Sequence, residues 1–312
     1  MTASVSTPAI ELDGIVKTYG RTTALDGLSL QVGRGELVGL LGPNGAGKTT
    51  AVKLLLGLTR PNRGQGRVLG APLGDRATRG RIGYLPELFR YQPYLRAREV
   101  LRLHTELARV PTARRAAAIE DALALVGLGD RADDPVGGFS KGMQQRLGLG
   151  VALLGEPELI LLDEPTSALD PIGRTDVRTI VRRARDRGAT VVLNSHLLTE
   201  VERVCDRVVI LHRGRAIASG ALDEIVARDG VRIRVTDLDA NGREALRTFG
   251  PTGADGEWLT IDGVDPARIP DIVASIVASG GRVHAVEPGG GSLEARFLEL
   301  IAGAGSVESD RP

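Results

Sequence analysis

The sequence predicts an α/β protein with a buried parallel sheet, an N-terminal antiparallel β subdomain, a helical insertion and a small C-terminal α+β domain. Two apolar stretches, Leu159–Leu162 and Val191–Leu193, each end in polar residues. Continuous apolar runs are typical of strands buried on both faces of a parallel sheet. A glycine-rich loop, Gly42–Thr50, joins a third predicted strand to a helical pattern, which is the order of an α/β unit. A change of composition after residue 228 indicates the second domain.

The bulk composition narrows the class of protein. The chain has 312 residues, more than one compact core usually holds, which favours two domains. Its formal net charge of +1 provides no field that would attract nucleic acid or an anionic membrane, so we expect no nucleic-acid partner. The single cysteine, Cys205, excludes an internal disulfide and fits a reducing compartment. No stretch resembles a signal peptide or approaches the roughly 18 to 20 apolar residues of a membrane span. We therefore expect a soluble, cytoplasmic protein.

The first domain is expected to cover residues 8–228. Periodicity and turn residues predict two strands over Ile10–Val32, short strands at Gly66–Gly70 and Arg81–Leu85, a helical insertion at about 90–155, a hairpin over Val208–Gly220 and a short helix over Asp223–Arg228.

The second domain, residues 229–305, carries neither a phosphate loop nor an acid pair. The pattern predicts strands at Val231–Val235, Trp258–Ile261 and Arg282–Glu287, with helices at Glu244–Phe249, Ile269–Val277 and after Ser292 as a cap. Residues 306–312 are expected to form a frayed tail.

The loop Gly42–Thr50 matches G-x-x-x-x-G-K-[ST], a phosphate-binding loop, in the strand-to-helix context that this motif requires. Its residues are Gly42, Pro43, Asn44, Gly45, Ala46, Gly47, Lys48, Thr49 and Thr50. The backbone N–H groups suit a polyphosphate, Lys48 adds a positive charge on the β- and γ-phosphates, and the Thr49 hydroxyl ligates Mg²⁺. The alternative is a glycine-rich connection with a chance lysine. The full pattern in this context favours the phosphate loop.

Two acids follow one predicted buried strand and a histidine follows the next. Asp163 would hold Mg²⁺ together with Thr49, and Glu164 would polarise a water for attack on the γ-phosphate. His196 could contact the same phosphate. Taken singly, an Asp-Glu-Pro segment is often only a turn, and a lone histidine is more often structural. Their occurrence in this order on one sheet, beside a phosphate loop, indicates a nucleoside triphosphatase.

Over roughly residues 10 to 225 the chain resembles the ATP-binding subunits of ABC transporters, which implies a P-loop NTPase core of ABC type that binds ATP. The motifs that carry the resemblance are the phosphate loop, the acid pair Asp163-Glu164, His196 as the switch histidine, a signature at Phe139-Ser140-Lys141-Gly142-Met143, a D-loop at Ser167-Ala168-Leu169-Asp170, and Tyr19 as the adenine-stacking aromatic. From the residues alone, Tyr19 could equally pack on the sheet. The segment Ser292–Glu299 is similar to the accessory domain of ABC-2-type export ATPases.

Two positions depart from the usual pattern of that family. Glu87 stands where glutamine is common; it keeps an oxygen for Mg²⁺ but adds negative charge. Lys141 and Met143 stand where glycine and glutamine are usual, a variant that resembles the ABC-2 export branch. Ser140 and Gly142, which face the phosphates, are kept.

The resemblance also implies partners. Two copies would meet head to tail, so that Ser140 and Gly142 of one cover the ATP on Lys48 of the other. A separately encoded membrane permease would receive the motion and hold the cargo path, which places the chain on the inner face of the cell membrane. The candidate contacts are Glu87, Phe89, Tyr91 and Tyr94, because interfaces favour aromatic residues. Packing of the helical insertion is the alternative for these aromatics. The rival function is a soluble ABC ATPase that drives a protein partner or assembly without transport.

Overall fold

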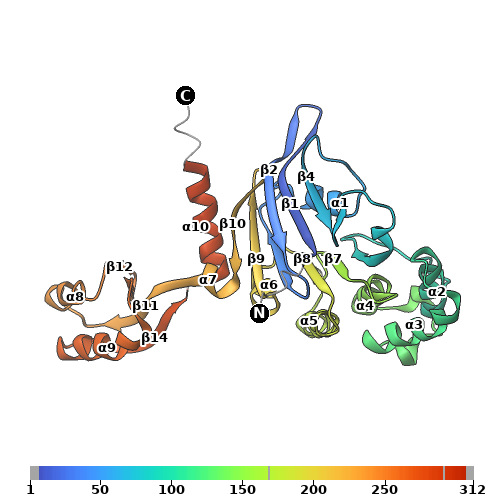
Figure 1. Cartoon of the computed structure of the whole chain (residues 1–312). Coiled ribbons are helices and arrows are strands. Elements are labelled where there is room, and N and C mark those ends of the chain that lie inside the picture. Colours follow the sequence, from blue (N-terminus) through green and yellow to red (C-terminus); the bar gives the residue numbers. More distant parts are fainter. Residues whose placement is uncertain (1–6, 168, 291, 307–312) are drawn as a thin grey trace, which may run out of the picture. The chain divides into compact units, whose positions relative to one another are not determined.

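The computed structural model describes residues 7–167, 169–290 and 292–306 (Figure 1). The chain divides into two compact units, one that runs to Leu222 and one that spans Asp223–Ala302. Each unit has its own hydrophobic core. The α/β class with a central parallel sheet, expected from the apolar strands, is confirmed.

The first unit begins with an antiparallel sheet. Its strands are β1 (Ile10–Tyr19), β2 (Thr22–Val32), β4 (Arg63–Val68) and β5 (Ala71–Pro72), in the order β2-β1-β4-β5. Inward-facing side chains such as Leu12, Leu28 and Val68 are buried in the same core as the central sheet. The antiparallel sheet is therefore packed onto the parallel one.

The central sheet has the order β10-β9-β3-β8-β7-β6. Its strands are β3 (Leu37–Leu41), β6 (Ile82–Leu85), β7 (Leu159–Asp163), β8 (Thr190–Asn194), β9 (Arg207–His212) and β10 (Arg215–Ala221). β3, β7 and β8 are buried along their whole length, as their unbroken apolar runs predict. β10 pairs antiparallel with β9, and the other neighbours run parallel.

Helices join these strands and form the insertion. They are α1 (Lys48–Leu55), α2 (Ala97–Leu107), α3 (Thr112–Leu125), α4 (Lys141–Leu153), α5 (Pro171–Asp186) and α6 (Leu198–Val204), with 3₁₀ turns at Thr78–Arg81, Gly129–Arg131 and Val136–Gly138. The short helix α7 (Leu222–Val226) follows β10 where the chain passes from the first unit to the second. The insertion, α2 to α4, lies on the β7 side of the sheet, away from β10 (Figure 1).

The second unit is a β-α-β-β-α-β arrangement with the strand order β12-β13-β11-β14, all antiparallel, which is the split βαβ pattern. Its elements are β11 (Ala227–Thr236), α8 (Ala240–Leu246), β12 (Thr252–Asp255), β13 (Trp258–Asp262), a 3₁₀ turn (Pro266–Arg268), α9 (Ile269–Ala278), β14 (Arg282–Gly290) and α10 (Leu293–Ser306).

Several predicted boundaries were wrong, for local reasons. The helix expected at Glu244–Phe249 is α8, which begins earlier because the Asp239 carboxylate accepts a hydrogen bond from Gly242 N at 2.7 Å. The helix expected at Asp223–Arg228 is α7, and Arg228 belongs to β11. β12 was not predicted, because its Thr-Gly-Ala-Asp sequence has little strand propensity.

At the C-terminus, Ser292 caps α10 as expected, with its Oγ accepting from Ala295 N at 3.2 Å. The helix includes Ser306, and the remainder of the expected tail, residues 307–312, lies outside the described residues, as does Ala168 of the predicted D-loop.

Candidate functional site

Three neighbouring strands end at one edge of the sheet and bring the predicted site residues together. β8 lies between β3 and β7, with Asn194 opposite both Leu40 and Asp163. All three strands run parallel, so their carboxyl ends share one edge, where open α/β sheets bind ligands. The phosphate loop follows β3, the acid pair closes β7 and His196 follows β8. Residues more than 100 positions apart in the sequence are thus neighbours here.

The phosphate loop passes so close to other backbone that only glycine fits at two points. Gly47 has a φ of 104°, and a Cβ there would lie 2.5 Å from the Ala24 carbonyl oxygen. A Cβ on Gly42 would lie 2.4 Å from the Leu211 carbonyl oxygen. α1 begins immediately after Gly47, so the free N–H groups of its first turn face the space beyond the loop. This is the geometry of an anion site at a helix N-terminus.

The Lys48 ammonium lies inside the loop. Its Nζ donates hydrogen bonds to the carbonyl oxygens of Gly42, at 2.6 Å, and Pro43, at 3.2 Å. Partial burial lowers the pKa of Lys48, while the charges of Glu164 and Asp163 raise it. The ammonium is therefore close enough to interact with both acids, and its present hydrogen bonds can be exchanged for phosphate oxygens.

The two acids are both 7% exposed and are held differently. Burial, the first cause, raises the pKa of Asp163, and the charges of Glu87 and Glu164 add to this; a hydrogen bond from Asn194 opposes them. The Asn194 Nδ2 donates that bond to Asp163 Oδ1 at 2.5 Å.

Glu164 has a φ of 51°, a conformation that is strained for a residue with a side chain. Its carboxylate accepts from His196 N at 2.9 Å and lies 2.8 Å from His196 Nδ1, while Ser195 Oγ donates to it at 3.3 Å. The glutamate is therefore oriented by two consecutive residues of the neighbouring strand end, and one of them is the predicted switch histidine.

The donor set at this edge fits a magnesium ion together with a nucleotide. Thr49 lies in the first turn of α1, and Glu87 is close enough for its charge to raise the pKa of Asp163. Among the described residues, no three His, Cys, Asp or Glu side chains form a cage for a metal ion. Mg²⁺ is commonly held by one or two carboxylates with phosphates and water, so one hydroxyl and one or two carboxylates suit it when phosphates complete the shell.

Tyr19 lies partly exposed at the end of a strand of the antiparallel sheet. The residue ends β1 and is 47% exposed, and Lys17 Nζ lies 4.9 Å from the ring centre. The ring thus keeps accessible surface on which a base could stack.

The signature and D-loop residues have local structural roles in the single chain. Ser140 caps α4 by accepting from Met143 N at 3.2 Å; Lys141 is exposed and Gly142 is half-buried. Asp170 caps α5 by accepting from Gly173 N at 2.7 Å. Among the described residues, no hydrogen bond joins the Ser140–Met143 segment to the phosphate loop of the same chain.

Ser167 is the D-loop residue tied to the acid pair. Its Oγ donates to the Glu164 carbonyl oxygen at 2.9 Å. The D-loop is therefore connected to the acid turn within one chain.

Two aromatics of the segment Glu87–Tyr94 pack within the protein, and the other residues of the segment are exposed. Phe89 and Tyr91 are half-buried, with ring centres 5.5 Å apart, and Tyr91 meets His104 of α2 edge-on at 5.8 Å. Burial raises the pKa of Tyr91. These two aromatics pack the insertion against the core. Glu87 and Tyr94 lie on the surface, and the neighbouring Leu88, which sequence reasoning missed, is 88% exposed.

Three further residues at the acid pair were also missed. Asn194 and Ser195 bind Asp163 and Glu164, and Gln145 of α4 donates through Nε2 to the Pro165 carbonyl oxygen at 2.8 Å. Their one sequence signal was position: Asn194 and Ser195 directly precede His196, and Gln145 follows the signature.

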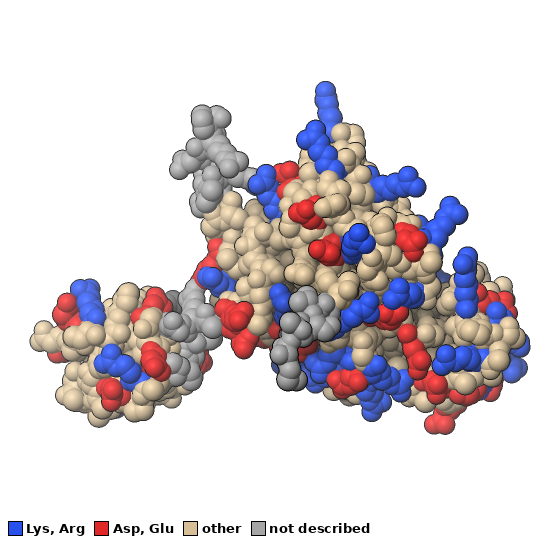
Figure 2. Space-filling model, viewed as in Figure 1, with Lys and Arg blue, Asp and Glu red and all other residues tan. Residues whose placement is uncertain are grey.

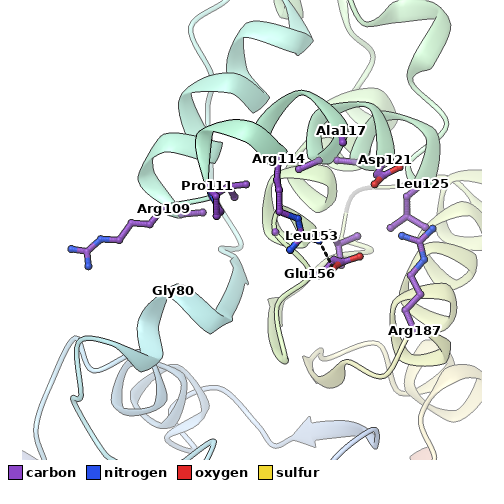
Figure 3. A pocket seen from close by; sticks show the side chains of 15 residues that line it. Gly80, Arg109, Pro111, Arg114, Ala117, Asp121, Leu125, Leu153, Glu156 and Arg187 are labelled. Carbon is purple, nitrogen blue, oxygen red and sulfur yellow. Dashed lines mark ion pairs between the residues drawn. The ribbon is translucent and has the colours of Figure 1, made fainter.

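The opposite edge of the sheet holds a cavity of about 260 Å³ between the insertion and the core (Figure 3). Gly80, Glu156 and Arg187, which precede the strands β6, β7 and β8, are among its lining residues. Arg114 points toward Glu156 and forms an ion pair with it at 3.8 Å, whereas Arg109 points outward. This cavity lies at the amino ends of the strands, so it is separate from the acid pair.

Two further properties are the distribution of charged side chains on the surface and the length and apolar character of the helices. Figure 2 shows basic and acidic side chains interspersed over the face in view. Within the described ranges, no helix is long and apolar enough to cross a membrane.

Comparisons with known proteins show which family the chain is similar to. The family model described as ABC transporter matches residues 25–167. An uncharacterized ABC transporter ATP-binding protein of Nostoc sp. is 37% identical over 95% of this chain and 91% of its own length. The Nod factor export ATP-binding protein I of Sinorhizobium fredii is 37% identical over 86% of this chain and 80% of its own.

Solved structures give the same result. The structure of an ATP-binding subunit of an ABC transporter is 34% identical in sequence and has a TM-score of 0.63. The match covers 70% of this chain and 92% of the chain in that structure. A dimeric ATP-binding cassette in a post-hydrolysis state, bound to ADP and Pi, is 26% identical and has a TM-score of 0.61. The match covers 68% of this chain and 98% of the chain in that structure. Together with the relatives, these similarities show that the chain belongs to the ATP-binding subunits of ABC transporters.

Proposed function

We propose that this chain binds ATP with Mg²⁺, hydrolyses it to ADP and phosphate, and thereby powers export through a separately encoded membrane permease. The observation that carries the catalytic part is the shared strand edge, where the loop of Lys48 lies beside the buried acids Asp163 and Glu164. A buried acid pair next to an anion site is the arrangement that phosphoryl transfer to water needs.

Each residue at this edge has a proposed role. Lys48 and the loop amides hold the phosphates, Thr49 and Asp163 bind Mg²⁺ with Glu87 as a further oxygen donor, and Tyr19 stacks on adenine. The bound ion would neutralise charge that develops on the phosphate oxygens. Glu164 accepts a proton from the attacking water. His196, whose Nδ1 lies 2.8 Å from Glu164 Oε1, orients that carboxylate and contacts the γ-phosphate.

The second wall of the nucleotide site is proposed to come from another copy of the chain. Ser140, Lys141, Gly142 and Met143 begin α4, where free N–H groups could meet the phosphates of a facing copy. Ser167 and Asp170 would lie at the same interface. Support comes from the solved relative described as a dimer with ADP and Pi.

The permease contact is proposed for the surface that includes Glu87, Leu88 and Tyr94. Nearby, a cavity of about 410 Å³ is lined by residues of both core and insertion, including Tyr84, His104 and Leu107. Leu107 is 69% exposed and Tyr94 is 74% exposed. Apolar surface of this kind marks interaction sites. Such a contact would place the chain on the inner face of the cell membrane.

Export is favoured over other directions because several relatives are described as Nod factor export ATP-binding proteins. The alternative is an ABC ATPase that drives a protein partner or an assembly process without transport. Affinity purification from membranes separates them: recovery of a polytopic membrane protein with this chain supports transport, and recovery of none favours the alternative.

Replacement of Glu164 by Gln tests the catalytic assignment. Gln keeps the size of the side chain but cannot accept the proton, so turnover should fall by about 10²- to 10⁴-fold. ATP binding should persist and the ATP-bound dimer should accumulate in size-exclusion chromatography. Glu156→Gln, an exposed acid before the same strand, is the matched control and should hydrolyse ATP normally. Normal turnover by Glu164→Gln would show that the assigned base is wrong.

A further inference from the structure

We propose that Asn194 is a positioning residue that sets the Asp163 carboxylate for Mg²⁺ and accepts a hydrogen bond from the hydrated ion. The inference rests on the proposed function, since it assumes that Asp163 binds the metal. Asn194 closes β8, is 3% exposed and lies directly opposite Asp163 in the β7–β8 register.

Asn194 holds both acids, through different groups. Its side-chain Nδ2 donates to Asp163 Oδ1 at 2.5 Å, and its backbone oxygen accepts from Glu164 N at 2.8 Å. Any residue could supply the backbone oxygen. The bond to Asp163 needs a donor of this length, which an aliphatic side chain of similar volume cannot provide.

The bond leaves the Asp163 carboxylate with one oxygen occupied and one available. In the described part of the chain, Oδ1 accepts from Asn194 and no hydrogen bond reaches Oδ2. A carboxylate with one oxygen anchored cannot rotate freely, so its second oxygen is presented in a fixed direction. Preorganised ligands of this kind bind a metal ion more tightly than mobile ones.

The amide oxygen of Asn194 is the second observation. Among the described residues, the buried side-chain polar atoms without a hydrogen-bond partner are Asn194 Oδ1 and Thr166 Oγ1, and both residues adjoin the acid pair. Buried polar atoms are normally paired, and an exception at a site points to a ligand that completes it. Mg²⁺ retains several of its waters, which are strong donors, when it binds with phosphates. A metal-bound water therefore suits the unpaired amide oxygen.

Two replacements separate positioning from a merely structural tie between β7 and β8. Asn194→Leu keeps the approximate volume and removes the amide; Asn194→Ala removes it without adding bulk in case the leucine does not fit. Thr190→Val is the matched control: it lies on the same strand, is 1% exposed, and its hydroxyl accepts from Gly35 N at 3.0 Å. That control loses a buried hydrogen bond at the other end of β8.

The measurement is the affinity of the full chain for a fluorescent ATP analogue, titrated with Mg²⁺ and repeated in EDTA. For both Asn194 variants we expect the affinity for the analogue in EDTA to stay within about twofold of wild type. The Mg²⁺ concentration that gives half-maximal binding should rise about 10- to 100-fold, which is the usual effect of losing a partner of a metal ligand. Turnover at saturating Mg²⁺ should recover largely. Thr190→Val should be less heat-stable but require no more Mg²⁺ than wild type.

Three outcomes overturn the inference. A wild-type Mg²⁺ requirement in both Asn194 variants would show that the amide does not serve the metal. If the Asn194 variants lose as much affinity for the analogue in EDTA as they lose with Mg²⁺, the defect is a general one of the nucleotide site and not one of metal binding. If wild type itself binds the analogue equally with and without Mg²⁺, the proposed function fails and the inference fails with it.

Discussion

The buried ion pair between Arg178 and Glu200 allows the effect of single replacements on the free energy of unfolding to be worked out from the structure. Arg178 Nη1 donates to both oxygens of Glu200, at 3.0 and 2.9 Å, and the side chains are 15% and 5% exposed. The pair joins α5, which follows the D-loop, to α6, which follows His196.

The two single replacements should differ in size. Arg178→Met leaves the Glu200 carboxylate buried without its cation, which costs about 3 to 5 kcal/mol of unfolding free energy. Glu200→Gln keeps one acceptor, and Arg178 is more exposed and retains its bond to Thr175 Oγ1 at 2.8 Å. That change should cost about 1 to 2 kcal/mol. The double variant Arg178→Met/Glu200→Leu should lie within about 1 kcal/mol of wild type, because no charge is then stranded.

Urea unfolding followed by far-UV circular dichroism measures these differences. Trp258 is the single tryptophan and lies in the second unit, so its fluorescence follows that unit separately. We expect the dichroism transition to shift in the order given and the Trp258 transition to shift less. Equal losses for both single variants, or a double variant as unstable as Arg178→Met, would refute the reasoning.

Three further predictions concern the phosphate loop, the stacking of Tyr19 on the adenine base, and stability at acid pH. In Gly47→Val the new Cβ would lie 2.5 Å from the Ala24 carbonyl oxygen, so the loop could not keep its present path. The affinity for a fluorescent ATP analogue should fall at least about 100-fold while the dichroism spectrum stays unchanged. Retained affinity would contradict this geometric argument. Tyr19→Ala should weaken ATP binding about 10-fold in calorimetry and Tyr19→Phe should not, since stacking on a base contributes about 1 to 3 kcal/mol; equal effects would exclude stacking. Hydrogen bonds from Arg81, and then from Arg34, lower the pKa of Glu158 from 4.5 to about 2, so its stabilisation is present above pH 4.5 and lost as the pH falls toward 2. Because these side chains are about 40% exposed, Glu158→Gln should cost only about 1 kcal/mol at pH 7, and the difference in urea midpoint should shrink at pH 3; a constant difference would exclude this pair as its source.

Much of the fold could be predicted because its signals are local. The strands β3, β7 and β8 were recognisable from short apolar runs, since a strand buried on both faces needs no polar side chain. α8 and β12 were less predictable. The start of α8 depends on a single cap at Asp239, and β12 pairs with β13 although its own residues favour no strand.

The candidate site shows the same division. The phosphate loop and Asp163-Glu164 were predicted as motifs, whereas Asn194 and Gln145 were not. Both missed residues act through hydrogen bonds to partners distant in sequence, Asp163 and Pro165. Phe89 and Tyr91 were expected either at a partner or in the insertion, and only the packing against α2 places them in the insertion.

The sequence by itself determined where the glycine loop and the acid pair lie, and so which short segments are predicted to carry chemistry. Glycines that must allow a close backbone approach, and acids that must follow a buried strand, are needed at fixed local spacing. The tertiary structure alone decided that β8 lies between β3 and β7, and therefore that Asn194, Ser195 and His196 meet the acid pair. Strand order results from pairing between segments far apart in the chain, and no local pattern encodes which neighbour each strand will take.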